Sequence, residues 1–117
     1  PYTVNHHADQ GVIVVTWLGL LTTDTGAPYR ATGSYLRKTM QVGGTAGGGS
    51  VRLLGSLWSQ AEASPEWFIL HDQTGANLEI GVGGAEAREN VLQIYPTVIG
   101  GDGTTVFSVR VMLSDPN

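Results

Sequence analysis

The stretch "VFSVRVML", residues 106–113, alternates between an apolar face and a mixed face along its whole length. A two-residue period with one apolar side is typical of a β-strand that covers a core with one face and meets solvent with the other. The positions predicted to face the core are Phe107, Val109, Val111 and Leu113. This segment predicts a strand, and it sets the pattern for the rest of the chain.

Turn-forming residues divide the remaining chain into segments of strand length. Seventeen glycines and five prolines punctuate the 117 residues, and the intervening segments are rich in Val, Ile, Thr, Trp and Tyr. Further strands are predicted over residues 12–18, 35–42, 51–58, 67–71, 78–82 and 91–99. Only residues 61–63 and 86–90 have helical character. The count and spacing predict an all-β, single-domain β-sandwich, jelly-roll-like, with seven or eight short antiparallel strands.

Individual segments predict how the strands are buried and connected. Residues 12–18 are apolar on both faces, which predicts a strand buried on two sides, whereas residues 35–42 alternate and predict a half-exposed strand. The glycine-rich residues 43–50 predict a long-tipped hairpin, and "GGDG", residues 100–103, predicts a tight hairpin turn. Pro96 cannot donate a ladder hydrogen bond, so its strand is expected at a sheet edge or with a bulge.

The composition predicts a surface that is neutral or covered. Hydrophobic residues make up 41% of the chain and charged residues only 14%, whereas roughly a quarter of the residues in soluble proteins are charged. Either neutral polar groups dominate the surface or other subunits cover much of it, as in an assembly. The length suits one domain, which we expect to comprise an N-terminal arm, residues 1–10, and a β-sandwich domain, residues 11–117.

Charge and cysteine content exclude several classes of partner and site. The net charge is -4, and the 6 Lys and Arg residues are scattered, so no basic patch is present for nucleic acid. The absence of cysteine excludes disulfides, thiolate metal sites and a cysteine nucleophile. No apolar run approaches the roughly 20 residues of a membrane span, and "PYTVNHHADQ" does not resemble a signal peptide. We expect no nucleic-acid partner, no membrane partner and no export signal.

The stretch "LLTTDTGA", residues 20–27, resembles the local signature of retroviral-type aspartic proteases. Such a protease would bring two copies of Asp24 to about 3 Å from each other in a dimer. The family's late apolar pair before glycine is matched by "VIGG", residues 98–101, but here it leads into a strand where the family has a helix. Asp24 is also a suitable turn residue, because an Asp side chain can bind the backbone two residues on. We interpret Asp24 as a turn residue and keep the protease as the last alternative.

The remaining polar residues form no evident catalytic or metal-binding set. The possible metal ligands are His6, His7 and Asp9, and His71 with Asp72. A closed zinc site needs about four ligands at defined spacing, which neither group supplies. The glycine-rich loop lacks the Lys-Ser or Lys-Thr of a phosphate-binding loop, and no serine lies in a nucleophile elbow. We expect no cofactor, no metal and no enzymatic activity.

Four stretches occur in the order found in a family of phage proteins. They are "VTWLGL…DTGAP", "MQVGGTAGGGSVRLLGS", "HDQTGANLEI" and "YPTVIGGDGTTVFSVRVML". They resemble the small β-rich head proteins of tailed bacteriophages, in which a "QVxGT" strand, a Gly-rich loop, a strand ending "GS", a "DxxGxxL" turn and a "GGDGTT" turn recur. The resemblance implies a capsid decoration or cement protein, a homotrimer that binds the major capsid protein and stabilises contacts between capsomers. Its location would be the virion surface, after synthesis in the host cytoplasm.

The predicted contact elements are the N-terminal arm and the loops at one end of the sandwich. The arm residues expected to bind the shell are Tyr2, Val4, His6 and His7. The alternative function is a carbohydrate- or receptor-binding module of a virion, in which aromatic side chains would stack on sugars. The candidates for that platform are Trp58, Trp67, Tyr29 and Tyr35, although aromatic residues in a small sandwich also fill the core or an interface.

Overall fold

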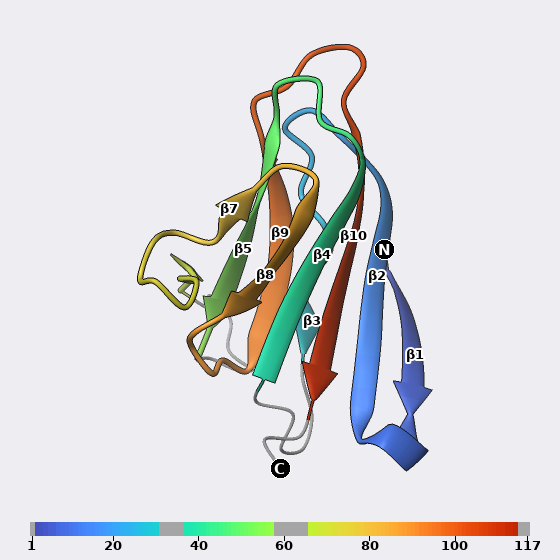
Figure 1. Cartoon of the computed structure of the whole chain (residues 1–117), viewed down its shortest axis with the longest axis vertical. Coiled ribbons are helices and arrows are strands. Elements are labelled where there is room, and N and C mark those ends of the chain that lie inside the picture. The colour runs from blue at the N-terminus through green and yellow to red at the C-terminus, as the bar shows by residue number, and fades with distance from the viewer. Residues whose placement is uncertain (1, 31–36, 58–65, 115–117) are drawn as a thin grey trace.

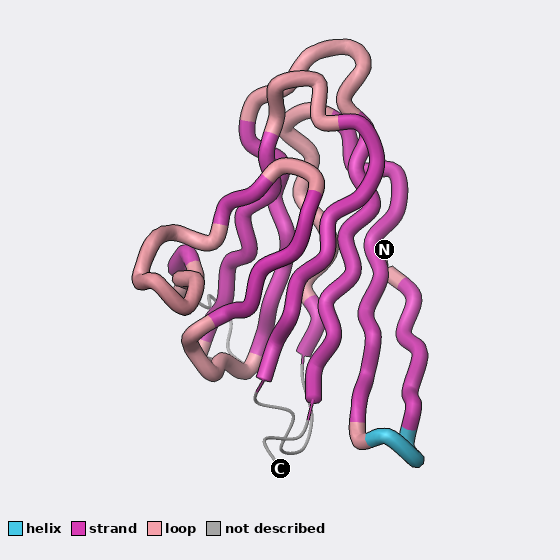
Figure 2. The backbone as a smooth tube through the Cα atoms, in the orientation of Figure 1, coloured by secondary structure: helices cyan, strands magenta, loops and turns pink. Residues whose placement is uncertain are grey.

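The structure, a computed structural model, describes residues 2–30, 37–57 and 66–114, and strands make up most of this part of the chain (Figures 1 and 2). Its elements are β1 (Thr3–His7), the 3-10 turn η1 (Ala8–Gln10), β2 (Val12–Leu21), β3 (Tyr29–Arg30), β4 (Arg37–Thr45), β5 (Ser50–Ser56), β6 (Phe68–Ile69), β7 (Glu79–Ile80), β8 (Gly83–Ala87), β9 (Gln93–Ile99) and β10 (Val106–Ser114). The all-β prediction is confirmed.

The strands form two antiparallel sheets that pack face to face (Figure 1). Sheet A has the order β1-β2-β10-β4-β8, and sheet B has the order β3-β9-β5-β6, with β7 also paired to β5. Most strands that follow one another in sequence lie in opposite sheets. Two four-stranded sheets connected in this way, β2-β10-β4-β8 and β3-β9-β5-β6, are the arrangement of a jelly roll. The predicted jelly-roll-like β-sandwich is therefore confirmed.

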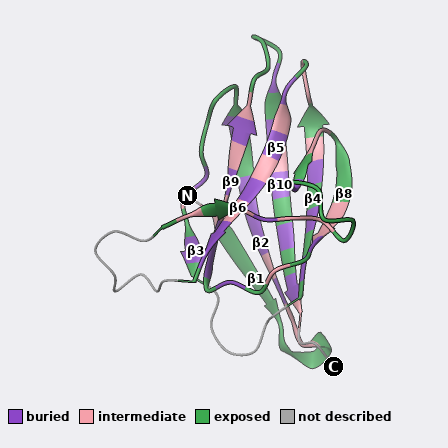
Figure 3. Cartoon of the chain, turned by 90° about the vertical axis from the view of Figure 1, so that its left-hand side faces the viewer, coloured by how far each residue is buried: buried purple, intermediate pink, exposed green. Residues whose placement is uncertain are grey.

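The central strand of sheet A is β10, which pairs with β2 on one side and β4 on the other. Its four apolar positions, the first residues predicted to face the core, are all 0% exposed. Lys38, Met40 and Val42 of β4 are also buried, and the residues between them are exposed, so the half-exposed strand predicted there is confirmed. Figure 3 shows buried and exposed residues alternating along the strands, as expected when only one face of each sheet meets the core.

A β-bulge interrupts the pairing of β2 with β10. The register shifts between Phe107, which pairs with Leu20, and Val109, which pairs with Trp17. Leu18 and Gly19 of β2 therefore lie opposite the single residue Ser108 of β10. Gly19 has a φ of 68°, a conformation that suits glycine at a bulge. The extra residue lets both Trp17 and Leu20 point into the core although they are three positions apart.

Both predicted hairpins are wrong. β4 belongs to sheet A and β5 to sheet B, so residues 46–49 carry the chain from one sheet to the other. The same holds for residues 100–105, which connect β9 in sheet B to β10 in sheet A. Together with residues 22–28, these crossing loops gather at one end of the sandwich, at the top of Figure 1. Glycine-rich patterns indicate where the chain turns, but a strand after the turn can pair with its predecessor or pack across from it.

The structure adds three strands that the sequence did not predict, β1, β3 and β8. β8 includes Glu86 and Ala87, so the helical character expected over residues 86–90 is wrong. Ala, Glu and Arg favour helices in isolation, but pairing with the edge of β4 overrides that preference. The other predicted helical segment, residues 61–63, lies outside the described residues.

Pro96 occupies a ladder position that needs no donor. Its partner across the ladder, Leu53, directs its N–H to the carbonyl oxygen of Leu78 (3.2 Å) and its own carbonyl oxygen to the N–H of Leu70 (2.9 Å). On its other side β9 pairs with the two-residue strand β3 and forms a bridge between Thr25 and Thr97, and the Pro96 carbonyl oxygen accepts a hydrogen bond from the Gly26 N–H at 2.8 Å. The missing N–H of proline therefore breaks no hydrogen bond between β5 and β9.

Candidate functional site on the outer face of sheet A

The face of β2 and β10 that points away from the core carries apolar side chains. Leu18 and Leu21 of β2 are 64% and 52% exposed, and Val106 and Met112 of β10 are 41% and 39% exposed. Residues 12–18 were predicted to be buried on two sides. In the structure one side faces the core. On the other side Leu18 is 64% exposed, Val12 and Val14 are half-buried, and Thr16 is buried at 8% exposure. We call this apolar surface of β2 and β10 the outer stripe.

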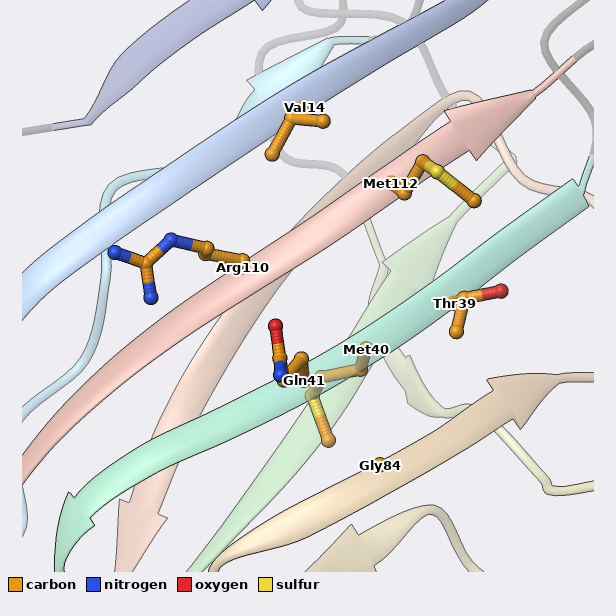
Figure 4. A pocket seen from close by; sticks show the side chains of 7 residues that line it. All are labelled: Val14, Thr39, Met40, Gln41, Gly84, Arg110 and Met112. Carbon is orange, nitrogen blue, oxygen red and sulfur yellow. The ribbon is translucent and has the colours of Figure 1, made fainter.

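A groove of about 470 Å³ begins at Val14 and Met112 of the outer stripe and extends across β4 to β8 (Figure 4). It is lined by Val14, Thr39, Met40, Gln41, Gly84, Arg110 and Met112. The sheet register brings these residues together from strands far apart in sequence, since Met112 lies between Val14 and Thr39 and Arg110 lies beside Gln41. The groove thus crosses four neighbouring strands, from β2 to β8.

Gly84 leaves one corner of the groove open. It lies directly across from Gln41 in the ladder between β8 and β4, so a larger residue here would place a side chain beside the groove. A β-carbon on Gly84 would come no closer than 3.5 Å to another heavy atom, the Met40 carbonyl oxygen, which is ordinary van der Waals contact. Position 84 can therefore hold a side chain, and the groove is open at this corner because glycine has none.

Arg110 supplies a positive charge to the groove. Two other arginines have acidic partners, since Arg37 lies 3.4 Å from Glu86 and Arg52 lies 2.5 Å from Glu79. Across residues 2–30, 37–57 and 66–114, Arg110 makes no ion pair. An arginine with free donors can form charge-assisted hydrogen bonds to a carboxylate of a bound partner.

The residues predicted to bind the shell are divided between two faces of β1. Thr3–His7 pair with β2, so half of the predicted N-terminal arm is an edge strand of sheet A. Val4 and His6 lie across from the buried residues Val15 and Ile13, whereas His7 lies across from Val12 on the outer side. Among the four predicted residues, His7 is the one that shares a face with the groove.

Tyr2 belongs to the core margin of the domain itself. Its ring packs edge-on against Trp17, with ring centroids 5.9 Å apart, and against Tyr29, with centroids 5.4 Å apart. Trp17 is also held from the other side, because its indole N–H donates to the carbonyl oxygen of Ala27 at 2.8 Å. A side chain engaged in this cluster has little surface left for a partner, so Tyr2 has a structural role in the domain.

Asp24 has the turn role that its sequence context predicted. Its carboxylate accepts a hydrogen bond from the backbone N–H of Leu21 at 2.8 Å, and its own N–H donates to the Leu21 carbonyl oxygen at 2.9 Å. Thr23, between them, has a φ of 61°, the one positive φ at a non-glycine residue in the described chain. In an aspartic protease the corresponding turn exposes its aspartate, whereas here the Asp24 carboxylate closes the turn through its hydrogen bond with Leu21.

The crossing loops are hydrogen-bonded to one another. The Thr22 hydroxyl donates to the Gly100 carbonyl oxygen at 2.5 Å, and the Thr105 hydroxyl donates to the Ala46 carbonyl oxygen at 2.9 Å. The Asp102 carboxylate accepts bonds from the N–H and the hydroxyl of Thr104, and these bonds lower the pKa of Asp102. The "GGDG" segment is therefore part of a hydrogen-bonded loop that connects the two sheets, and it is not the hairpin that was predicted.

The residues considered as possible metal ligands make other contacts in the structure. His6 and His7 point to opposite faces of β1, as neighbouring strand residues do. The ring Nδ1 of His71 contacts a carboxylate oxygen of Glu89, and the Asp72 carboxylate accepts hydrogen bonds from Thr74. Within the described residues no group of three or more His, Asp or Glu side chains lies close enough to hold a metal ion.

Lys38 is a charged residue inside the sandwich. It is 0% exposed and lies between Leu113 and Ala87 in sheet A, on the core side of β4. Burial lowers the pKa of Lys38 from 10.5 to about 8, because the charged form loses its hydration. The sequence placed Lys38 on the apolar face of its strand but gave no indication of complete burial.

The candidate sugar-stacking residues are also divided. Tyr29 is buried at 9% exposure, in the cluster with Tyr2. Trp67 is half-buried and lies edge-on to Tyr95, with ring centroids 4.7 Å apart and an interplanar angle of 78°. Trp58 and Tyr35 lie outside the described residues. No pattern in the sequence marks Tyr95, whose partner Trp67 is 28 positions away and is brought near by the sheet.

Comparisons with known proteins show the fold and no family. No family model matches the chain, and no curated protein matches its sequence. The SPBc2 prophage-derived protein YomS is similar in structure, with a TM-score of 0.61, 9% identity, and coverage of 87% of this chain and 93% of that one. The chain thus has the fold of a small phage-derived β protein. The described residues include no helix long and apolar enough to span a membrane.

Two further solved structures are similar in fold, and one of them is a cupin protein. An RmlC-like cupin protein from Desulfovibrio desulfuricans has a TM-score of 0.51 at 8% identity, covering 97% of this chain and 80% of that one. Vicilin from Solanum melongena has a TM-score of 0.50 at 15% identity, covering 92% of this chain and 24% of that one. At these identities the likeness concerns the fold alone.

The cupin likeness corrects one prediction. The sequence predicts no enzymatic activity because it contains no evident catalytic set. The chain nevertheless shares its fold with an RmlC-like cupin protein, and one fold can carry unrelated functions, catalytic ones included. The prediction that the chain has no enzymatic activity is therefore wrong, because neither the composition nor the fold class supports that exclusion.

Proposed function

We propose that this chain is a capsid decoration protein of a tailed phage, and that the outer stripe of sheet A docks on the major capsid protein of the head. The observation that carries the proposal is the row of accessible apolar side chains on β2 and β10, which the chain itself leaves uncovered. Large apolar surfaces on small domains mark sites of protein association. The fold shared with a prophage-derived protein supports a phage origin.

The chemistry of the outer stripe suits a protein interface. Charged residues are depleted at interface cores while Met and Arg are enriched, and the groove combines Met112 and Arg110 with Val14. Arg110 can pair with a carboxylate of the capsid protein, and burial of that pair within the interface would exclude water from it. Burial of apolar surface contributes roughly 25 cal/mol per Å², so burial of the apolar side chains of the stripe favours association.

Stabilisation of the shell follows from mass action. A protein that binds only the closed lattice shifts the equilibrium away from separated capsomers, by an amount that grows with its free concentration. We further propose that copies of the chain associate as a homotrimer on the outer surface of the virion. Three linked footprints act at high effective concentration, so each can be weak while the whole remains bound.

The test is co-sedimentation with emptied, expanded heads that lack this chain. Wild-type protein is expected to bind saturably. Met112→Asp places a charge on the stripe, and Gly84→Phe fills the open corner of the groove without touching the core, so each should weaken binding by at least about tenfold, or roughly 1.4 kcal/mol.

A matched control comes from another exposed apolar residue. Leu92 is 47% exposed and lies outside sheet A, so Leu92→Asp introduces the same charge on a different surface and should leave binding unchanged. Equal binding by all four proteins would contradict the role of the stripe, and absence of wild-type binding would contradict the decoration function.

A further inference from the structure

The outer face of sheet B carries a row of apolar and aromatic side chains. Leu54 of β5 lies between Ile69 of β6 and Tyr95 of β9 in the sheet register. Trp67, just before β6, reaches the same row, since its ring centroid is 4.7 Å from that of Tyr95. All four side chains are half-buried, so the row is supported by the sheet and still open to solvent.

A polar row lies next to the aromatic row on the same face. Residues two apart on a strand share a face, so Arg52 lies beside Leu54 and Thr97 beside Tyr95. Arg52 pairs with Glu79 across the ladder, and its Nε donates to a Glu79 carboxylate oxygen at 2.5 Å. The other oxygen of Glu79 accepts from the Ser50 hydroxyl at 2.8 Å.

These contacts fix the polar groups and balance their charge. The hydrogen bond from Arg52, with a smaller contribution from Ser50, lowers the pKa of Glu79, which is therefore ionised at neutral pH. Arg52 and Glu79 then contribute one positive and one negative charge. A guanidinium group carries five N–H donors, and the bond from Arg52 to Glu79 uses the one on Nε.

We propose that this face of sheet B is a binding site for a neutral pyranose oligosaccharide. The C–H faces of a pyranose ring stack on aromatic side chains such as Trp67 and Tyr95, and adjacent hydroxyls form paired hydrogen bonds with planar guanidinium and carboxylate groups. Charge balance at Arg52 and Glu79 disfavours anionic sugars and suits a neutral one.

The saccharide site is separate from the shell-docking stripe. It lies on sheet B, whereas the outer stripe lies on sheet A, and the two outer faces point in opposite directions across the sandwich (Figure 1). A copy docked through sheet A would present the saccharide site away from the shell. The saccharide site does not depend on the proposed function and can be tested on the isolated protein.

Saccharide binding can be measured by saturation-transfer NMR and by titration of the tryptophan indole N–H signals. The probes are maltohexaose, cellohexaose and chitohexaose, each added to the full chain. At least one should bind saturably, with affinity at least tenfold lower for Trp67→Ala and at least threefold lower for Glu79→Gln. Glu79→Gln keeps the size of an exposed side chain, so it decides the matter if Trp67→Ala does not fold.

Controls distinguish this site from the outer stripe. Gly84→Phe, on sheet A, should leave saccharide affinity unchanged while it weakens head binding. The saccharide site is disproved if no probe binds, or if the affinity is the same in every folded variant of Trp67 and Glu79. Neither result bears on co-sedimentation with heads, which tests the decoration function by itself.

Discussion

Gly44 lies so close to the backbone of Val106 that a β-carbon on Gly44 would be less than 3.0 Å from the Val106 carbonyl oxygen. Gly44 also has a φ of 102°, which side-chain-bearing residues rarely adopt. Both features occur where β4 leaves sheet A toward the crossing loop, beside the start of β10. Glycine is therefore required at this position for two independent reasons.

Gly44→Ala should lower the free energy of unfolding by about 3 kcal/mol, through backbone strain of about 1–2 kcal/mol and a steric clash of similar size. Gly48→Ala is the matched control, because Gly48 has a φ of 81° but open space around its missing β-carbon. Gly48→Ala should lower the free energy of unfolding through the backbone strain alone. Urea denaturation of both variants measures the difference, and equal losses would show that the contact with Val106 costs nothing.

Thr23 holds a left-handed conformation without being glycine, with a φ of 61°. Thr23→Gly should raise the free energy of unfolding by about 0.5–1 kcal/mol, because relief of strain exceeds the entropy that glycine adds to the unfolded chain. Thr23→Ala keeps the strain and should not stabilise. Thermal denaturation of the two variants separates these effects, and a destabilised glycine variant would contradict the prediction.

Leu18 is the extra residue of the β2 bulge, so its deletion should be tolerated. Without Leu18, Gly19 would lie opposite Ser108 in a regular ladder, and Trp17 and Leu20 would still point into the core. Deletion of Val14 should abolish folding, because it shifts one half of β2 by one residue and turns its core side chains outward. Circular dichroism and size-exclusion chromatography compare the two deletions. Loss of the fold in both would show that the bulge itself is required.

Lys38 should make stability depend on pH in the alkaline range. Its pKa is about 8 in the folded chain and 10.5 when unperturbed, so between these values the unfolded chain binds more protons. The free energy of unfolding should therefore rise as pH increases from about 8 to 10.5, by on the order of 3 kcal/mol. Lys38→Met should lack this rise. The quantity to compare is the difference between the two pH curves, because every other ionisable group is common to both proteins.

Tyr2 should contribute to stability more than to binding. Tyr2→Ala removes edge-on contacts with Trp17 and Tyr29 and should cost about 1–2 kcal/mol, while His7→Ala on the exposed side of β1 should change stability by less than about 0.5 kcal/mol. Chemical denaturation measures both. Deletion of residues 1–10 would remove an entire edge strand, so single substitutions are the better test of shell contacts at this end of the chain.

Strand positions follow from local sequence more closely than strand partners do. The alternation over residues 106–113 and the burial of Met40 and Val42 depend on side-chain period alone, and both predictions are confirmed. Sheet membership depends on where distant strands pack, so the glycine-rich residues 43–50 predicted a hairpin where the chain changes sheets. The β2 bulge could not be predicted from the sequence either, because Gly19 within an apolar run has the appearance of a turn residue.

The candidate site shows the same division between local and distant information. Apolar residues on both faces of residues 12–18 predicted two-sided burial, and that pattern is the sequence signal of the outer stripe. The groove itself arises because Gly84 of β8 lies beside Gln41 of β4 and Arg110 of β10 lies on the far side of Gln41. No pattern within one strand predicts that juxtaposition.

The place of β10 in sheet A has a consequence during synthesis. The last described strand of the chain fills the centre of the sheet, so β2 and β4 have no common neighbour until the ribosome has passed Ser114. Until then the nascent chain holds two separate halves of a sheet, and their apolar faces are open to chaperones and to one another. Formation of the native sandwich must therefore await release of β10 from the exit tunnel, whatever the earlier strands have done.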